Sequence, residues 1–314
     1  MDSLACVGID VGGTYIKGGV VRDDGTVLAE KNKKTNGNQG PDAVLESIVR
    51  LVQELISESE APVQGVGVGV PGQIDVARGM VREAPNLPAL RNIPVQQALG
   101  KRLDLPVRLD NDANVAALGE HAWGAGQGAR DMLMVTLGTG VGGGLILRNE
   151  LYHGAVGAAG EFGHTVIDHD GPLCGCGRRG CVEAFVGAAA IIRTVREQIA
   201  AGDISILSNI NPDELTPKDV HQAALQHDAV ARAALEKAGR YLGVGLGSVA
   251  NLLNPERIVV GGGVAGAGDY ILTPARKSLS EIAMKASAEA ISIVPAALGN
   301  RAGWMGAARL ASPL

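Results

Sequence analysis

Four side chains that commonly bind metal lie close together between residues 160 and 183. They are His164, Cys174, Cys176 and Cys181. One imidazole and three thiolates suit a four-coordinate Zn(II) ion in a closed tetrahedral site. Three of the chain's four cysteines fall in this stretch, and such clustering favours metal over a disulfide pair or inert buried thiols. We therefore expect a structural zinc ion that fixes the shape of this loop.

Two carboxylates flank these ligands. Glu161 precedes His164 by three residues, and Glu183 follows Cys181 by two. A bound metal ion would hold both carboxylates still, so that they can bind hydroxyl groups of a substrate. A hydrolytic zinc ion is the competing interpretation, but it needs an open coordination position and four ligands close this site. The ion is therefore expected to support a polar pocket.

Three glycine-rich turns follow expected strands. The first two can bring backbone N–H groups close to a phosphate, and the third could let an adenine or ribose lie flat against the backbone. They are Asp10-Val11-Gly12-Gly13-Thr14, residues 138–144 beginning Gly138-Thr139-Gly140, and Gly261-Gly262-Gly263. The first is neither a P-loop with its lysine nor a GxGxxG motif that opens a helix. Glycine at a hairpin tip is common without any ligand, but three such turns in one chain favour a bound nucleotide.

An acidic segment, Asp110-Asn111-Asp112, lies between an expected strand and an expected helix. Asn and Asp are common helix caps, which is the structural interpretation of this segment. The functional interpretation is that one carboxylate accepts a proton from a substrate hydroxyl while the neighbouring amide holds the substrate. The residues alone leave both interpretations open.

Strands and helices alternate along the chain, which predicts an α/β protein. Expected strands cover residues 4–10, 15–22, 26–30, 63–70, 107–109, 132–137, 142–148, 257–260 and 291–294, and expected helices cover residues 41–58, 95–103, 113–121, 186–201, 217–251, 274–286 and 303–310. Residues 76–94 contain turn signals and are expected to be loop-rich. A strand, a glycine turn and a second strand open the chain and recur in its middle, which suggests that the two halves share an architecture.

Composition limits the classes of partner. The chain has 314 residues, 46% of them hydrophobic, a net charge of −5 and only 3% aromatic residues. This composition fits two domains with buried cores and argues against a nucleic-acid partner, which needs a basic face and stacking side chains. No apolar run reaches the roughly 18 residues of a membrane helix, and the N-terminus lacks the pattern of a secretory signal. We therefore expect a cytoplasmic protein without a membrane partner, in which the fourth cysteine, Cys6, is a small buried hydrophobe.

In chain order, these motifs resemble the ROK family of sugar kinases and repressors, and most closely its bacterial glucokinases. The segments that carry the resemblance are Asp10-Val11-Gly12-Gly13-Thr14 with Lys17, Asn111-Asp112-Ala113-Asn114, Gly160-Glu161-Phe162-Gly163-His164, and the cysteine segment 174–183. The likeness runs from about residue 5 to about residue 310. The cysteine segment is highly specific, whereas the first glycine turn is shared by the wider superfamily of actin and hexokinase.

The resemblance implies a two-lobed α/β fold of the actin/hexokinase-like (ribonuclease H-like) class, with a cleft between the lobes. It implies a smaller N-terminal lobe at residues 1–115, on which a C-terminal helix at about residues 301–314 packs. A larger lobe at residues 116–300 would carry the zinc loop and the nucleotide site.

The resemblance also implies ATP-dependent phosphorylation of a hexose 6-hydroxyl, with D-glucose as the first candidate and Asp112 as the general base. The sugar-binding positions would be Gly72, Asn86, Asn111, Asp112, Glu161, His164 and Glu183. The positions for the nucleotide would be Asp10, Gly12, Gly13, Thr14, Lys17, Gly138, Thr139, Gly140, Gly261, Gly262 and Gly263. Asp10 would orient Mg(II), and His164 would use one ring nitrogen for zinc and turn the other toward the sugar.

Several alternatives stay open at this point. Mannose, fructose, N-acetylglucosamine and N-acetylmannosamine are further candidate substrates. A sugar-sensing regulator without catalysis is another class, which the presence of Asp10, Asp112 and the glycine turns disfavours. Family repressors carry an N-terminal helix-turn-helix segment, whereas this chain is expected to start in its first strand. Many family glucokinases have an aromatic residue soon after the position of Asn86, where this chain has Pro88-Ala89-Leu90. The resemblance further implies a homodimer or a homotetramer.

Overall fold

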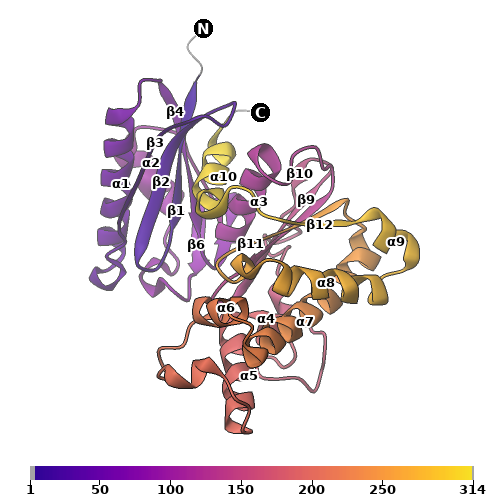
Figure 1. Ribbon diagram of the computed structural model, residues 1–314. Coiled ribbons are helices and arrows are strands. Elements are labelled where there is room, and N and C mark those ends of the chain that lie inside the picture. The colour runs from indigo at the N-terminus through magenta and orange to yellow at the C-terminus, as the bar shows by residue number, and fades with distance from the viewer. Residues whose placement is uncertain (1–3, 313–314) are drawn as a thin grey trace. The chain divides into compact units, whose positions relative to one another are not determined.

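The computed structural model describes residues 4–312 (Figure 1). The chain forms two compact units, each with its own core. Unit 1 comprises the chain up to residue 134, residues 144–160 and the chain from residue 296; unit 2 comprises residues 135–143 and 161–295. These unit boundaries differ from the lobe boundaries predicted at residues 115 and 300. The outermost residues of the predicted N-terminal lobe, 1–3 and 313–314, lie outside the described residues.

Unit 1 is built on a five-stranded sheet with the order β3-β2-β1-β4-β7. Its strands are β1 (Ala5–Val11), β2 (Tyr15–Arg22), β3 (Val27–Lys34), β4 (Val63–Val70) and β7 (Val107–Asn111). Strands β1, β2 and β3 are antiparallel neighbours, while β4 runs parallel to both β1 and β7. The pairing Asp10↔Gly69↔Asp110 places the ends of β1, β4 and β7 at one edge of the sheet. Carboxyl ends of parallel strands are where open α/β sheets bind ligands.

Four helices accompany this sheet: α1 (Pro41–Glu58), α2 (Val95–Leu103), α3 (Asp112–Trp123) and α10 (Ala302–Ala311). Helix α1 forms where predicted, because Pro41 suits its first position and its apolar residues repeat on one face. Helix α10 packs against β1 and β4 so closely that a Cβ atom on Gly8 or Gly67 would lie 1.7 Å from a carbonyl oxygen of α10. Glycine at these two positions is therefore required for the contact.

A short hairpin replaces part of the predicted loop at residues 76–94. Strands β5 (Gln73–Asp75) and β6 (Met80–Glu83) pair antiparallel, and Gly79 turns the chain between them with φ of 60°. Most of residues 76–94 is loop and turn, as predicted, but the hairpin was not predicted, because its strands are too short, and too rich in polar residues, to show a period of two.

The second sheet has the order β10-β9-β8-β11-β12. Its strands are β8 (Met132–Leu137), β9 (Val141–Leu147), β10 (Glu150–Leu151), β11 (Arg257–Gly261) and β12 (Ser292–Pro295). In chain order this sheet has the same arrangement as the first one, with a hairpin-connected trio followed by two strands on the other side. The agreement supports the prediction that the two halves share an architecture.

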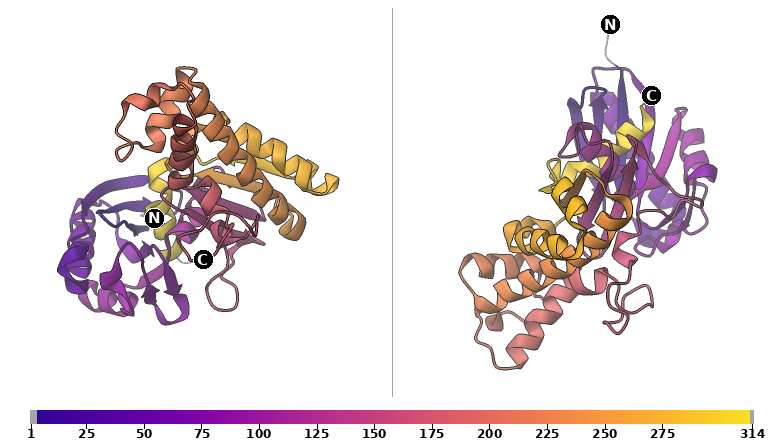
Figure 2. Two further views of the ribbon diagram at one scale, coloured as in Figure 1. Left: turned by 90° about the horizontal axis from the view of Figure 1, so that it is seen from below. Right: turned by 90° about the vertical axis from the view of Figure 1, so that its right-hand side faces the viewer.

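The helices of unit 2 are α4 (Glu183–Val186), α5 (Ala188–Ala200), α6 (Pro217–Leu225), α7 (Ala229–Leu253), α8 (Asp269–Ile282) and α9 (Lys285–Ala290). Helices α7 and α8 run side by side (Figure 2). Gly239 and Gly243, one turn apart on α7, allow this approach, since a Cβ atom on either would lie 2.3 Å from a carbonyl oxygen of α8. Helix α8 begins before the predicted start at Pro274, which lies inside it and packs on Gly239.

Within residues 4–312, no helix combines the length and the apolar character needed to cross a membrane. Cys6 is buried among Val21, Trp304 and Met305, as predicted, and burial raises the pKa of its thiol to about 11.

Candidate functional site

The predicted metal ligands lie together in unit 2. The ligand atoms of His164, Cys174, Cys176 and Cys181 are all within 4.8 Å of one another. Cys174 Sγ is 3.7 Å from His164 Nδ1, and Cys176 Sγ is 3.7 Å from Cys181 Sγ. Ligands about 2.0–2.3 Å from a tetrahedral zinc ion are separated by roughly 3.6–3.8 Å, so the cluster has the dimensions of a zinc site. All four cysteines of the chain are free, which excludes the disulfide interpretation in this structure.

Tight turns shape the cysteine loop. The Cys174 N–H donates to the Arg178 carbonyl oxygen at 2.8 Å, and the Gly177 N–H donates to the Cys174 carbonyl oxygen at 3.0 Å. Gly180 has φ of 72°, and a Cβ atom there would lie 1.5 Å from the Asp168 carbonyl oxygen. The loop can therefore turn three sulfur atoms toward one point only with glycine at position 180.

The thiols differ in acidity. Burial raises the pKa of Cys174 to about 12, whereas a backbone hydrogen bond from Arg178 lowers the pKa of the exposed Cys176 to about 7. Thiolates are the form that binds zinc. Cys176 is therefore the thiol most readily ionised before metal binding, and the remaining ligands lose their protons as the metal enters.

Glu183 connects the cysteine loop to the second glycine turn. It is the first residue of α4, and its Oε2 accepts the Val141 N–H at 3.0 Å. Its Oε1 accepts the Cys174 thiol proton at 3.3 Å. A Cβ atom on Gly140 would lie 2.6 Å from Glu183 Oε2, so a larger residue here would displace this carboxylate. A carboxylate predicted from the sequence to bind sugar is thus held between the metal cluster and the glycine turn.

The two glycine turns of unit 2 lie next to each other. Gly138 donates its N–H to the Gly140 carbonyl oxygen at 2.9 Å, and the Gly138 carbonyl oxygen accepts the Ala188 N–H at 3.0 Å. Gly262 has φ of 91°, and a Cβ atom there would lie 2.3 Å from the Leu137 carbonyl oxygen. The turn after β11 therefore packs directly on the end of β8.

Glu161 and His164 flank a short 3-10 helix, Phe162–His164. The His164 N–H donates to the Glu161 carbonyl oxygen at 3.0 Å, and Gly163 abuts the Val141 carbonyl oxygen. Because Nδ1 of His164 faces Cys174, Nε2 is the ring nitrogen left for another partner. The Glu161 side chain is exposed and makes no hydrogen bond within residues 4–312.

In unit 1, the acidic segment forms the turn between β7 and α3. Asn111 is the N-cap of α3, and its Oδ1 accepts the N–H groups of Ala113 and Asn114 at 2.8 and 3.2 Å. Its Nδ2 donates to the Gly72 carbonyl oxygen at 3.0 Å, so two predicted sugar-binding residues are in contact. Asp112 is the first residue of the helix. The capping interpretation is thus correct for Asn111, and Asp112 is placed by the cap.

Asp10 lies near Asp112 and Lys17. The pKa of Asp10 is raised to about 6, mainly by burial and also by the charge of Asp112, while the charge of Lys17 opposes the shift. Asp10 and Lys17 are register partners on β1 and β2. A cation placed beside the two carboxylates would lower this pKa, since opposite charge favours the ionised form.

The first glycine turn is fixed by a residue that the sequence analysis missed. The Gly12 N–H donates to the Tyr15 carbonyl oxygen at 3.0 Å. Thr35, which is fully buried, donates its hydroxyl to the Gly12 carbonyl oxygen at 2.7 Å and its N–H to the Thr14 carbonyl oxygen at 3.0 Å. Asn86 is exposed, and its carbonyl oxygen would lie 3.4 Å from a Cβ atom on Gly13. A threonine that ends a polar strand gives no sequence signal for this role.

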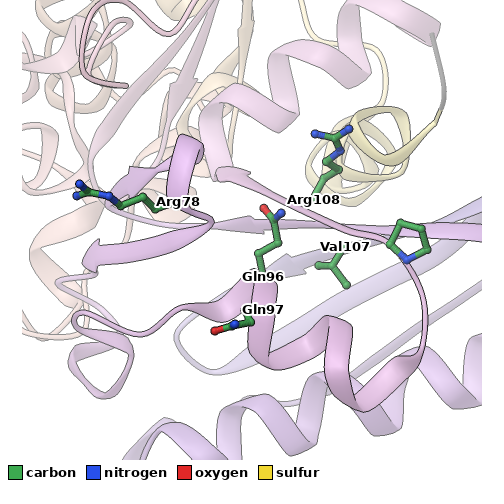
Figure 3. Close-up of a pocket in the computed structure, with 6 residues that line it drawn as sticks. Arg78, Gln96, Gln97, Val107 and Arg108 are labelled. Atoms are coloured by element: carbon green, nitrogen blue, oxygen red, sulfur yellow. The ribbon is translucent and has the colours of Figure 1, made fainter.

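A polar hollow of about 390 Å³ lies elsewhere on unit 1 (Figure 3). It is lined by Arg78, Gln96, Gln97, Pro106, Val107 and Arg108. None of these residues belongs to the predicted site, so this hollow is separate from the segments that carry the motifs.

Comparison with known proteins identifies the family. The profile of the ROK family matches residues 6–313. The chain belongs to the ROK family. A glucokinase of Halalkalibacterium halodurans is 39% identical to it over 307 residues, which cover 96% of this chain and 92% of the relative.

A solved structure agrees with this assignment. A ROK family glucokinase from Streptomyces griseus, crystallised with glucose and AMPPNP, is 37% identical, with a TM-score of 0.84 over 98% of this chain and 99% of that chain. The predicted α/β fold of the actin/hexokinase-like class is thereby confirmed. The family also includes regulators: a xylose repressor of Caldicellulosiruptor bescii is 33% identical over 97% of this chain but only 77% of its own length.

Proposed function

We propose that this ROK family member is a glucokinase, which transfers the γ-phosphoryl group of ATP to the 6-hydroxyl of D-glucose. The observation that carries the proposal is the similarity, along nearly the whole chain, to a glucokinase whose structure contains glucose and an ATP analogue. The placement of Asp112 at the carboxyl edge of the first sheet, beside Asp10, supports it.

Asp112 is proposed as the general base. Its carboxylate takes the proton from the sugar 6-hydroxyl while that oxygen forms a bond to the γ-phosphorus. The bond between the γ-phosphorus and the bridging oxygen breaks, and ADP leaves with that oxygen. Asn111 supports the step because its cap fixes the first turn of α3, on which Asp112 lies.

We propose that the sugar is bound by the residues that the resemblance implies: Gly72, Asn86, Asn111, Glu161, His164 and Glu183. Carboxylates and amides suit the hydroxyl groups of a sugar, because they accept and donate several hydrogen bonds. In unit 1, the contact between Asn111 and Gly72 supports this assignment. In unit 2, the free Nε2 of His164 and the exposed carboxylate of Glu161 support it.

The nucleotide is proposed to bind at the glycine turns, with Asp10, Gly12, Gly13, Thr14, Lys17, Gly138, Thr139 and Gly140 at the phosphates and Gly261, Gly262 and Gly263 at the adenosine. Bare glycine backbones can donate N–H groups to phosphate oxygens without a side chain in the way. Mg(II), when bound with ATP, neutralises charge on the transferring phosphoryl group. Asp10 is the carboxylate placed to orient it.

We propose that the cysteine cluster holds a structural zinc ion. Four good ligands close the site, so the ion has no position for a reacting water. Its contribution is to folding and to the position of Glu183, which follows the ligand Cys181 by two residues. We further propose a homodimer or homotetramer, as the resemblance implies, and a cytoplasmic location, where ATP is available and free thiols persist. Light scattering after size exclusion would determine the number of subunits.

The first experiment measures ADP release from Mg-ATP with glucose, mannose, fructose, N-acetylglucosamine and N-acetylmannosamine offered separately. We expect a strong preference for glucose. A preference for another of these sugars would replace the substrate but keep the enzyme class. Absence of turnover with every sugar, in protein confirmed to contain zinc, would favour a sugar-sensing regulator instead.

The second experiment tests the general base. Asp112→Asn removes the proton acceptor and is expected to lower kcat by about 100-fold or more. Asp104→Asn is the matched control: Asp104 is exposed and has φ of 52°, a conformation that asparagine adopts readily. Unchanged turnover in Asp112→Asn would show that the assigned mechanism is wrong.

A further inference from the structure

A fully buried carboxylate lies beside the proposed base. Asp110, on β7, has a side chain with 0% exposure. Its Oδ1 accepts the Asn111 N–H at 2.7 Å and the Asn114 Nδ2–H at 2.9 Å. Its Oδ2 accepts a hydrogen bond from His153 Nε2 at 2.6 Å. A buried carboxylate is costly unless charge and hydrogen bonds compensate it, and His153 is the partner that can carry a positive charge.

His153 comes from a different part of the chain, the segment 144–160 of unit 1. Its side chain is 29% exposed, and the hydrogen bond to Asp110 raises the pKa of its imidazole. The His153 carbonyl oxygen accepts the Ala159 N–H at 3.0 Å, which closes a small loop. Gly154 and Gly157 allow this loop to turn, with φ of 70° and 79°. The loop ends just before Glu161. The hydrogen bond from His153 to Asp110 attaches this segment to β7.

The contacts of Asp110 reach the residues that surround Asp112. Asn111, whose N–H Asp110 binds, caps α3 and contacts Gly72. Asn114, whose amide Asp110 binds, is buried in the first turn of α3. Asp112 lies between these two residues. Loss of the His153 hydrogen bond would leave Asp110 without the only partner among the described residues that can carry a positive charge, and we expect the turn to relax toward another arrangement.

We propose that His153 is a positioning residue for phosphoryl transfer, which acts through Asp110 to hold the β7–α3 turn so that Asp112 is aligned with the sugar hydroxyl. This inference rests on the proposed kinase function. It assigns a role to a residue that is not among the proposed substrate-binding residues and that belongs to none of the motifs found in the sequence. Misplacement of a reacting group by about 1 Å can cost 100-fold in rate, so the effect is expected in kcat.

The test compares kcat and KM of the full chain, with glucose and Mg-ATP, for the wild type and three variants. His153→Ala is expected to lower kcat at least tenfold while KM for ATP stays within about threefold, since the change is expected to displace the general base and not the nucleotide-binding residues. His153→Gln keeps an N–H donor near the position of Nε2 and is expected to recover most of kcat. His121→Ala is the matched control, because His121 lies on α3 and bonds the Ala129 carbonyl oxygen at 3.0 Å, away from the turn. The His121→Ala variant is expected to have a lower melting temperature but the kcat of the wild type.

A double-mutant comparison tests the route through Asp110. Asp110→Asn and His153→Ala combined are expected to reduce kcat no more than Asp110→Asn alone, because residues that act as a unit are not additive. If His153→Ala does not fold, the double variant is measured in its place, because it also removes the Asp110 charge that His153→Ala leaves uncompensated. A kcat at least tenfold below that of the wild type then supports the proposal.

Three outcomes would overturn the proposal. One is a kcat within threefold of the wild type for His153→Ala, or for the double variant in its place; another is an equal loss in His121→Ala. In these cases an inactive Asp112→Asn with an active wild type would show that the proposed kinase function stands and only the role of His153 fails. The third outcome, a wild type without turnover on any sugar, would overturn both.

Discussion

The raised pKa of Asp10 predicts that its ionised carboxylate destabilises the folded protein at neutral pH. The pKa rises from 3.8 to about 6, mainly because burial disfavours the charged form. Below pH 3.8 the group is neutral in both the folded and the unfolded chain. As the pH rises from about 3.8 to about 6, the unfolded chain releases this proton first, so the contribution of Asp10 to stability falls and is lowest above pH 6.

The size of the expected change in the free energy of unfolding follows from the change in the pKa of Asp10. A change of about two pKa units corresponds to roughly 3 kcal/mol. Asparagine cannot ionise, so Asp10→Asn should remove this cost, which already includes the repulsion from Asp112 and the attraction to Lys17. Partial exposure of the site reduces the gain. We expect Asp10→Asn to be about 1–3 kcal/mol more stable than the wild type at pH 7.5, and to show little of this gain at pH 4.

Urea unfolding followed by tryptophan fluorescence suits this test. The chain has two tryptophans, Trp123 and Trp304, and both belong to unit 1 with Asp10. The signal therefore reports on the unit that contains the perturbation. Measurements without nucleotide and magnesium keep the carboxylates free of a cation, and Asp104→Asn serves as the exposed control. Kinase activity should be lost in Asp10→Asn even though its stability rises.

The reasoning would be refuted by either of two results. One is an unfolding midpoint for Asp10→Asn at pH 7.5 that equals or lies below that of the wild type. The other is a stability difference that is the same at pH 4 and pH 7.5, because the cause would then not be ionisation.

Three further predictions concern the metal cluster and the packing of unit 1. Cys176→Ser should lower both the zinc content, measured by mass spectrometry, and the melting temperature; an unchanged melting temperature after verified zinc loss would contradict the structural role. Gly67→Ala should destabilise the protein by about 3 kcal/mol or more, because its Cβ atom would lie 1.7 Å from the Ala307 carbonyl oxygen. Gly100→Ala, inside α2 with no atom closer than 3.8 Å, should instead be neutral or stabilising by up to about 1 kcal/mol, and equal effects of the two changes on the urea midpoint would contradict the packing argument. Glu120→Gln should cost about 1–3 kcal/mol in the same assay, since the buried carboxylate accepts the N–H groups of Ala125, Ala297 and Leu298; a wild-type midpoint would show that the amide replaces it.

Much of the fold could be predicted because local signals and tertiary structure agree. Helix α1 and strands β2, β4 and β8 have the predicted bounds, since each has one clear periodicity and ends at a turn residue. The hairpin of β5 and β6 was missed because pairing between two short polar strands is decided by tertiary contacts. The start of α8 was missed because Pro274 suggests a first turn, whereas Gly239 on α7 makes room for it in the helix.

The candidate site likewise contains features that the sequence predicts and features that it does not. The metal ligands could be predicted because their residue types are rare and their spacing is short. The contact of Glu183 with the Val141 N–H could not, because it joins residues far apart in the chain. Thr35 and His153 were missed for a related reason: each is an ordinary residue in sequence whose role comes from one partner in space. The assignments of individual residues to sugar and nucleotide stay predictions until the variants are measured.

The packing of α10 has a consequence for how the protein is synthesised. Strands β1 and β4 end at residues 11 and 70, whereas the helix that covers Gly8 and Gly67 begins at residue 302 and leaves the ribosome much later. At typical translation rates this face of the sheet waits on the order of tens of seconds for its cover. The carboxylate of Glu120 also lacks two of its donors until residues 297 and 298 arrive. Unit 1 therefore completes its fold only after α10 has emerged, and until then the nascent chain exposes an apolar sheet face that a chaperone can shield.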